Sequence, residues 1–471
     1  MDGLEIQEKS LSAIIENKDS RIDSQFWTTI ISRNPKYSYA KIGTILNQSQ
    51  YGISLEMNEE GIGYPIYRMN EIHNSVCDLD VKKYANITPQ ELDIFKLQDG
   101  DVLFNRTNSF EWVGRTGIYY KSTEQDEKVF ASYLVRLIPY AEQVLPEYLT
   151  AFLNTTNGVR QIKARARQSI NQTNVNPEEV KEIEIPLLSK KLQKAIQINY
   201  QSAHQKLVAA QKIYKLVEDM LNSSLGIADF IDEPCSIKTL SNSFMQSGRL
   251  DAEYYQKKYD ALFETLSQFT TINLGAENGL VSIKKSIEPG SEAYQDEGIP
   301  FVRVSDVNKY EIVEPTIKLS QTIVPNIESL YPHKDTILLS KDGSVGIAYK
   351  VQEDMQVVTS GALLHLTVKD TNQIIPDYLT LVLNSQVVQL QAERDCNGAI
   401  IQHWKPSDIE KVLIPVLDMD KQKEISDKVQ ESFRLRKEAK RLLDNAIKAV
   451  EMAIETDEET AIAWLSTNGV I

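Results

Sequence analysis

The sequence predicts an α+β fold: two mixed, mostly β modules separated by two long antiparallel coiled-coil helices, with a pseudo-twofold internal repeat. Three observations predict it. The chain has 471 residues, which is too long for one ordinary core. Short motifs return in the same order after 228 to 235 residues. Each half ends in a long stretch with a heptad pattern of apolar residues.

The heptad stretches are residues 192–222 and 421–455. In the first, apolar side chains recur at intervals of three and four positions, at Ile196, Tyr200, Ala203, Leu207, Ala210, Tyr214, Val217 and Leu221. The second keeps this alternation at Leu435, Ala439, Leu442, Ala446, Ala449 and Ala453, and its apolar face is widened by Leu443, Ile447, Val450 and Ile454. This alternation is typical of a coiled-coil seam. We therefore expect the two helices to pair antiparallel, with one module at each end.

Five pairs of segments carry the repeat. They are residues 21–27 and 249–255, 65–72 and 300–307, 102–106 and 337–341, 145–154 and 375–384, and 176–187 and 405–416. β-Branched, alternating segments predict strands at 65–72, 101–105 and 130–138, and at 301–307, 336–340 and 357–368. A helix is predicted at 146–154, with proline in its first turn. The predicted domains are two mostly β modules (1–190 and 249–420), two long helices (191–225 and 421–456), a linker (226–248) and a C-terminal tail (457–471).

Charge and composition limit the possible functions. The net charge of −15 argues against a protein that coats nucleic acid indiscriminately. Residues 189–222 carry +4 and residues 421–455 carry +2, so the rest of the chain carries −21 and the long helices are its basic part. No secretion signal and no apolar run long enough to cross a bilayer is visible, and three cysteines lie far apart. We expect a cytoplasmic protein without a membrane partner.

Enzyme motifs are weak. There is no Gly-x-x-x-x-Gly-Lys-Ser/Thr phosphate loop. Asn34-Pro35-Lys36-Tyr37 is similar to the Asn-Pro-Pro-Tyr of adenine methyltransferases, but lysine replaces a proline and no glycine-rich cofactor turn accompanies it. Pro376-Asp377 is similar to the start of a nuclease motif, but helix initiation explains it better. We expect no cofactor and no metal in this chain.

Signals for DNA binding are stronger. Residues 157–176 contain no acid, and they contain the basic residues Arg160, Lys163, Arg165 and Arg167 followed by the amides Asn171, Gln172 and Asn174. Basic side chains contact phosphates, and amides can bond bidentately to adenine. The alternative is a solvated helix face. A second group, Asn105, Arg106, Asn108 and Arg115, follows a strand where a loop could enter a groove, although a polar hairpin loop explains it equally well.

In the second half, Lys341 and Ser344 stand at the place of Arg106 onward, and Gln402, His403 and Lys405 at the place of residues 172–175. Arg68 and Arg303, which match each other in the repeat, complete the expected DNA contacts. Because the framework repeats while these residues differ, we expect two unlike half-sites in the DNA.

The chain resembles the specificity subunit of Type I restriction–modification systems. The resemblance rests on residues 249–255, 336–343 and 376–379, and on Ile414-Pro415 leading into a helix with Gln422, Lys423 and Ile425. It implies two target recognition domains that read a split, asymmetric sequence in double-stranded DNA. It also implies helices that set the gap and dock methyltransferase subunits, two of them expected, which bring S-adenosylmethionine. A restriction motor subunit that uses ATP would join them, and this chain would catalyse nothing alone.

Two other functions remain open from the sequence. One is a two-headed adaptor whose modules bind other proteins instead of DNA. The other is a self-contained modification enzyme built around Asn34-Pro35-Lys36-Tyr37.

Overall fold

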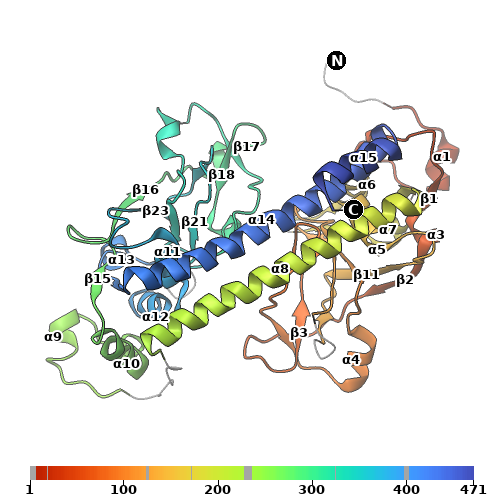
Figure 1. Cartoon of the computed structure of the whole chain (residues 1–471). Helices are drawn as coiled ribbons and strands as arrows, with labels where there is room; N and C mark the ends of the chain where they lie inside the picture. Colours follow the sequence, from red (N-terminus) through yellow and green to blue (C-terminus); the bar gives the residue numbers. More distant parts are fainter. Residues whose placement is uncertain are drawn as a thin grey trace. The chain divides into compact units, whose positions relative to one another are not determined.

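The computed structural model describes residues 7–17, 20–122, 127–170, 172–227, 236–323, 325–396 and 402–470 (Figure 1). The chain divides into two compact units. Unit 1 comprises Met1–Ala209 and Leu435–Ile471, and unit 2 comprises Ala210–Arg434. The predicted α+β class is confirmed, since each unit combines mixed sheets with parts of both long helices.

Unit 1 is built on a six-stranded sheet of order β2-β11-β7-β9-β5-β4. Its strands are β2 (Leu46–Tyr51), β11 (Leu134–Pro139), β7 (Val102–Asn105), β9 (Thr116–Ile118), β5 (Val76–Cys77) and β4 (Ile72–His73). Three smaller sheets join β10 (Val129–Phe130), β3 (Tyr64–Tyr67) and β6 (Tyr84–Ala85); β12 (Arg167–Gln168), β13 (Thr173–Asn174) and β8 (Thr107–Asn108); and β1 (Tyr39–Lys41) with β14 (Glu184–Pro186). The helices are α1 (Leu11–Glu16), α2 (Ser24–Thr28), α3 (Ile42–Ile45), α4 (Pro89–Phe95), α5 (Pro146–Leu153), α6 (Thr156–Arg165) and α7 (Pro177–Lys181).

Unit 2 repeats this plan with fewer strands. A four-stranded sheet of order β16-β23-β20-β21 contains β16 (Val281–Lys285), β23 (Leu363–Val368), β20 (Ile337–Ser340) and β21 (Ala348–Lys350). A second sheet joins β17 (Tyr294–Gln295), β19 (Lys318–Leu319), β18 (Ile299–Val302) and β22 (Val358–Thr359), and a third joins β15 (Thr271–Asn273) with β24 (Leu413–Pro415). The helices are α9 (Phe244–Ser247), η1 (Ala252–Tyr255), α10 (Lys257–Leu266), η2 (Ser291–Ala293), η3 (Val304–Asp306), η4 (Ile327–Leu330), α11 (Pro376–Asn384), α12 (Gln386–Asp395) and α13 (Pro406–Ile409).

The internal repeat is visible in the pairing of the strands. The order β2-β11-β7-β9 in unit 1 matches β16-β23-β20-β21 in unit 2. Each unit also contains a matching short parallel pair, β3 with β10 and β18 with β22, and unit 1 has a further parallel pair, β5 with β9. In addition, β1 with β14 corresponds to β15 with β24. The predicted strands at 101–105 and 336–340 and the helix at 146–154 are confirmed within a residue or two.

Two strand predictions are wrong in the same way in both units. The single strands expected at 130–138 and 357–368 are each two strands, because the chain turns after β10 and after β22. The turns are closed by Leu134 N donating to Ala131 O and Leu363 N donating to Ser360 O, both at 2.9 Å. After the turn, the chain leaves its parallel partner and joins the antiparallel sheet. Hydrophobic periodicity does not show this change of sheet because both segments are buried.

The strands expected at 65–72 and 301–307 also end early, for a shared reason. Arg68 N donates to Glu71 Oε2 and Arg303 N donates to Asp306 Oδ2, each at 2.8 Å. An acid that accepts from a backbone N–H three residues before it closes a turn. Accordingly, β3 ends at Tyr67 and β18 at Val302.

The two predicted long helices are confirmed as α8 (Lys190–Leu225) and α14 (Met419–Glu455). Their seam residues are buried, with Leu207, Leu435 and Ile447 half-buried. In unit 1, Lys206 Nζ donates to Glu438 Oε2 at 2.6 Å, and in unit 2, Ser432 Oγ donates to Ala210 O at 2.8 Å. Within unit 1, Ser189 N, just before α8, donates to Glu458 Oε1, beyond the end of α14, at 3.0 Å. Because the later Lys206 bonds the earlier Glu438, the two helices pair antiparallel in this unit.

Equivalent hydrogen bonds hold the two frameworks. Gln161 on α6 bonds both the N–H and the C=O of Glu184, and Gln391 on α12 bonds both groups of Leu413. All four distances are 2.9–3.0 Å. Glutamine supplies one donor and one acceptor from the same amide, which is what a single backbone residue needs.

The N-cap residue before each module helix, Leu145 before α5 and Ile375 before α11, is bonded to a long helix in the same manner. Gln193 Oε1 on α8 accepts from Leu145 N at 2.8 Å, and Gln422 Oε1 on α14 accepts from Ile375 N at 2.9 Å. These glutamines satisfy backbone groups that α5 and α11 leave open at their first turns.

A helix that the sequence patterns did not predict follows α14. Residues 457–471, expected only as a tail, contain α15 (Glu458–Asn468), whose Ala461 and Leu465 are buried in the unit 1 core. Asn468 O accepts from Asn445 Nδ2 at 2.6 Å, which fastens α15 to α14. Across the part of the chain that the structure describes, no helix combines the length and apolar character that a bilayer crossing requires.

Candidate nucleic-acid interface

In unit 1, the predicted binding residues meet around a short β-hairpin. Its strands β12 and β13 pair with Arg167 opposite Asn174, and β13 pairs in turn with β8, with Asn174 opposite Thr107. Thr107 Oγ1 donates to Asn174 Oδ1 at 2.6 Å. The structure therefore brings together the two groups that the sequence placed about 65 residues apart, namely residues 105–115 and 160–174.

The exposed side chains of this region are basic or carry amides. Arg160 lies exposed on α6, Arg167 and Gln168 lie exposed on β12, and Gln172 lies exposed where the hairpin returns. The exposed Gln168 was not among the predicted residues. Its position in the sequence, between the basic Arg167 and the amide residues Asn171 and Gln172, could have indicated it. Asn171 lies outside the described residues. Asn108 is half-buried, and its Oδ1 accepts from Ser109 N at 2.8 Å.

Lys163 supports the loop between β8 and β9. Its Nζ donates to the carbonyl oxygens of Phe110, of Glu111 at 3.2 Å and of Val113 at 2.9 Å. These residues form the loop from β8 to β9, so the lysine holds the loop by its backbone. Burial lowers the pKa of Lys163 to about 8, although the nearby Glu111 opposes this shift. Lys163 is thus occupied and not available to a phosphate in this conformation.

The same loop positions Arg115. Its guanidinium carbon lies 3.2 Å from the centre of the Trp112 ring, and Nη1 donates to Ile72 O at 3.5 Å. Arg106 likewise lies over a ring, that of Tyr51, at 5.2 Å. Stacking on an aromatic face fixes an arginine while leaving its edge able to bond a base or phosphate. Both side chains are half-buried.

Two predicted contacts are placed inside the module. Asn105 is 0% exposed, and its Nδ2 donates to Met69 O at 3.3 Å while its Oδ1 accepts from Thr107 N at 3.3 Å. Arg165 is 8% exposed. Neither reaches the surface in this conformation, so each supports the interface from behind instead of touching DNA.

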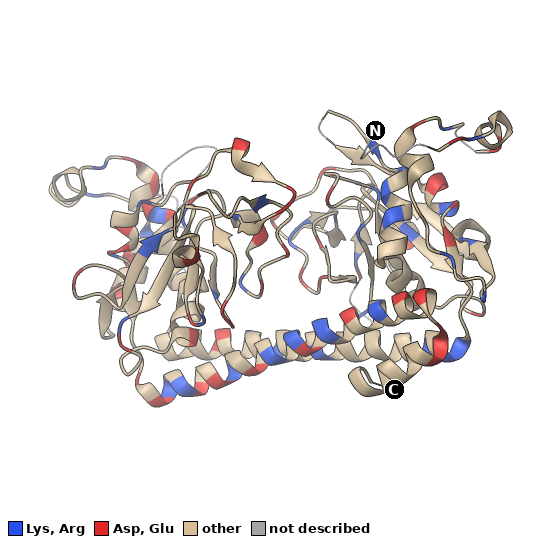
Figure 2. Ribbon diagram, turned by 90° about the horizontal axis from the view of Figure 1, so that it is seen from above, with Lys and Arg blue, Asp and Glu red and all other residues tan. Residues whose placement is uncertain are grey.

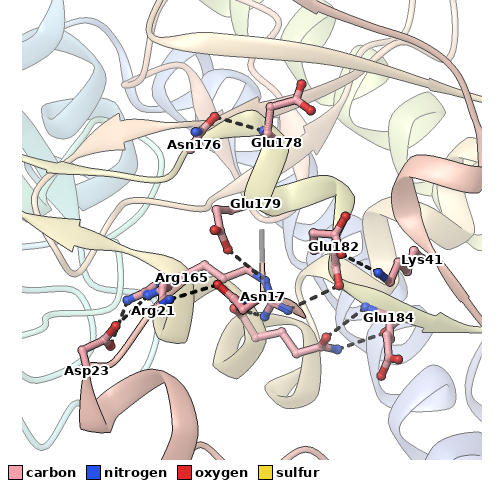
Figure 3. Close-up of polar contacts among 11 residues, drawn as sticks. Asn17, Arg21, Asp23, Lys41, Arg165, Asn176, Glu178, Glu179, Glu182 and Glu184 are labelled. Atoms are coloured by element: carbon pink, nitrogen blue, oxygen red, sulfur yellow. Dashed lines mark hydrogen bonds and ion pairs between the residues drawn. The ribbon is translucent and has the colours of Figure 1, made fainter. Parts of the chain in front are cut away.

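Arg165 is held by acids and carbonyls, as Figure 3 shows. Its Nη1 donates to Gln161 O at 3.0 Å, and its Nε lies 3.8 Å from Glu179 Oε2. Burial lowers the pKa of the Arg165 guanidinium, and Glu179 counteracts the shift. Its guanidinium carbon also lies 5.4 Å from the ring centre of Phe26, which follows the Arg21–Asp23 ion pair. Composition alone could not separate this buried arginine from the exposed Arg160 and Arg167.

Arg68 and Arg303 occupy matching turns and are paired. Arg68 forms an ion pair with Glu71, and Arg303 Nε lies 3.4 Å from Asp306 Oδ2. Because each acid also accepts from the arginine's own backbone N–H, both pairs brace the end of a strand. They are half-buried framework residues that present only part of the guanidinium to solvent.

The tip of unit 2 uses different chemistry at the same place. Asp342 and His403 form an antiparallel bridge, where unit 1 pairs Thr107 with Asn174. Lys341 forms an ion pair with Asp342, and His403 Nδ1 lies 2.8 Å from Asp342 Oδ1. Burial raises the pKa of Asp342, but the bonds from Lys341 and His403 outweigh it, and the net direction is down. Ser344, Gln402, His403 and Lys405 are exposed.

The residues considered for catalysis have structural partners. Asn34 Nδ2 donates to Thr456 O at 3.0 Å, and its Oδ1 accepts from Lys36 N at 3.0 Å, so the amide fastens the chain to the end of α14. Asp377 is buried, lies 3.2 Å from Lys350 Nζ and accepts from Ser426 Oγ at 3.2 Å. Among the described residues, no group of three or more His, Cys, Asp or Glu side chains is placed to hold a metal ion.

The charge pattern differs between the two long helices. Along α14, Lys and Arg, blue in Figure 2, are interspersed with Asp and Glu, red, whereas α8 has six lysines and only two acids, Glu218 and Asp219. Some of these charges neutralise one another, as Lys206 and Glu438 do across the helix pair and Lys421 and Glu424 do along α14. By contrast, residues 156–176 of unit 1 contain no acid at all.

Comparison with known proteins bears on this interface. Residues 273–448 match the family model described as the Type I restriction modification DNA specificity domain. This part of the chain is therefore similar to Type I specificity domains. The matched stretch runs from β15 through the tip of unit 2 and most of α14. The resemblance to specificity subunits of Type I restriction–modification systems is therefore confirmed.

Individual relatives agree with the family model. The putative Type I restriction enzyme MjaX specificity subunit of Methanocaldococcus jannaschii is 28% identical over 176 residues, 37% of this chain and 41% of the relative. The EcoKI specificity subunit of Escherichia coli is 26% identical over 156 residues, 33% of each chain. These matches thus span well under half of the length of the relatives. Among solved structures, the S subunit of the Type I system of M. genitalium covers 92% of this chain and 97% of its own, with 14% identity and a TM-score of 0.34.

Proposed function

We propose that this chain is the DNA-recognition subunit of a Type I restriction–modification complex and that it has no catalytic activity of its own. One observation carries the proposal: equivalent frameworks present unlike tips at the same place, Thr107 with Asn174 in unit 1 and Asp342 with His403 in unit 2. Two copies of one reader would suit a symmetric site. Unlike tips on one framework suit a bipartite, asymmetric site, with each module reading one part.

The hairpin of unit 1 has the chemistry that such a reader needs. Exposed Arg160 and Arg167 can neutralise phosphates, and the amides of Gln168 and Gln172 can bond base edges. Arg106 and Arg115 stand behind them on aromatic rings. We therefore keep these exposed and stacked residues as proposed contacts, and we assign Asn105, Lys163 and Arg165 to support. In unit 2 we keep Ser344, Gln402, His403 and Lys405, with Lys341 held by Asp342.

The partners follow from the same proposal. Methyltransferase subunits, two of them expected, would dock on α8 and α14 and bring S-adenosylmethionine, and an ATP-dependent motor subunit would join for restriction. The helices would also set the gap between the two parts of the site. A helix of 36 residues, such as α8, is roughly 54 Å long, more than one turn of duplex DNA.

A salt titration tests DNA recognition by the first module. We expect Arg160→Ala with Arg167→Ala to lower the slope of log K against log salt by about two, since each lost phosphate contact removes roughly 0.9. The matched control is Lys82→Ala, an exposed basic residue of unit 1 outside the hairpin and the long helices, with no change expected in the slope. The assay uses the chain co-expressed with its modification subunits and a random-sequence duplex. An unchanged slope in the double variant contradicts the phosphate role of the hairpin.

The same assay separates the adaptor function. A two-headed protein adaptor would retain no duplex at low salt, whereas a specificity subunit in its complex should retain random duplexes weakly. Binding of S-adenosylmethionine to the purified chain, measured by calorimetry, would instead favour a self-contained modification enzyme.

A further inference from the structure

The tip of the β12–β13 hairpin carries an apolar side chain that has no packing role within its unit. Ile170 is 99% exposed, the highest value among the large hydrophobic residues of the described chain. Its neighbours on the hairpin, Gln168, Ser169 and Gln172, are exposed polar residues. A lone isoleucine in a polar setting does not form the broad apolar patch that a protein partner would cover.

The hairpin below this side chain is firmly held. Ser169 N and Oγ both bond Gln172 O, at 2.8 and 2.7 Å. Thr173 is buried, and Asn174 is fixed by Thr107. Because these residues are held before any partner binds, little ordering of them is left to oppose insertion of Ile170.

The surroundings of Ile170 favour a polyanion as its partner. Arg167 flanks it on β12 and Arg160 lies on α6, and residues 156–176 contain no acid. An apolar side chain amid basic and amide residues has a known use on duplex DNA. Such residues insert between neighbouring base pairs, partly unstack them and kink the helix.

We propose that Ile170 is such a wedge: it enters the base stack at the half-site read by the first module and opens one base step. This inference rests on the proposed function, because it requires the hairpin to lie on DNA. Arg160 and Arg167 hold the backbone on either side, and the amides read the bases next to the opened step. The specificity of this half-site then includes how easily that step unstacks.

Fluorescence of 2-aminopurine tests the wedge. The probe is a duplex enriched from a randomised library by the chain co-expressed with its modification subunits, with 2-aminopurine placed at one position of the first half-site at a time. We expect a severalfold rise in fluorescence on binding at one or two adjacent positions. Ile170→Ala should abolish the rise and weaken binding about tenfold, with the salt slope unchanged, since no charge is lost. Ile170→Leu should retain the signal.

The matched control is Ile22→Ala, an equally apolar and 82% exposed residue of unit 1 outside the hairpin, which should keep both the signal and the affinity. If Ile170→Ala binds with the wild-type fluorescence rise, the wedge is wrong while the proposed function stands. If the wild-type complex enriches no duplex from the library, the proposed function fails and the wedge fails with it.

Discussion

The two units differ least where they are buried and most where they are exposed. Gln161 and Gln391 make the same pair of backbone bonds, and Tyr148 OH and Tyr378 OH donate to the carbonyls of Pro186 and Pro415, at 2.5 and 2.7 Å. The tips share only their place in the fold. The residues that repeat in this chain are therefore those that the fold requires, and the residues that differ lie where a ligand could bind.

The largest expected effect tests whether the frameworks are equivalent. Gln161→Leu and Gln391→Leu each leave a backbone N–H and C=O without their partner in a buried setting, so each should lower the free energy of unfolding by roughly 2–4 kcal/mol. Chemical denaturation of the full chain measures it. Gln168→Leu, at an exposed position, is the control and should change stability by less than about 0.5 kcal/mol. A large loss of stability for one of the two variants and none for the other would show that the two frameworks are not equivalent.

Part of the fold and of the interface could be predicted from the sequence, and part could not. The heptad seam predicted both long helices, because burial along a helix is periodic in sequence, and the strands at 101–105 and 336–340 were predicted from their β-branched, alternating residues. The break between β10 and β11 within residues 130–138 could not be predicted. It arises because β10 pairs with β3 whereas β11 pairs with β7. Nor was the burial of Asn105 and Arg165, whose partners lie on other elements. Arg160 and Arg165 look alike in sequence, and only packing against Glu179 separates them.

The second expected effect depends on a difference inside the frameworks. Arg136 on β11 and His365 on β23 occupy equivalent positions in the two units. Arg136 Nη1 lies 3.1 Å from Asp101 Oδ2, whereas His365 Nε2 lies 2.7 Å from Thr359 Oγ1. Burial lowers the pKa of His365 from 6.5 to about 4. Between pH 6.5 and 4 the unfolded chain therefore binds a proton that the folded chain does not, so stability falls as pH falls through this window.

The loss attributable to His365 should approach roughly 3 kcal/mol at pH 4. Denaturation of His365→Gln at pH 7 and pH 4.5 should show a smaller drop than the wild-type chain, while His333→Gln, at an exposed position, should show the full drop. If both variants behave alike, the buried histidine does not set the acid sensitivity of unit 2.

The smallest expected effect sharpens the comparison of the tips. Asp342 neutralises Lys341 and engages His403, whereas Thr107 stands at the matching position of unit 1. Asp342→Asn should release the lysine and tighten binding of the complex to a duplex about fivefold at 0.1 M salt, with the salt slope steeper by about one. Asp370→Asn, an exposed position of the same unit, is the control. Weaker binding by Asp342→Asn would mean that the aspartate positions the tip instead of masking its charge.

The central claim is that each unit reads its own part of a divided DNA site. Selection from a randomised duplex library by the wild-type complex and by an Arg167→Ala, Gln172→Ala variant tests it most directly. We predict that the wild type enriches two short, unlike sequences at a fixed gap, and that the variant relaxes only one of them. Enrichment of a single continuous sequence, or equal relaxation of both parts, would contradict the account.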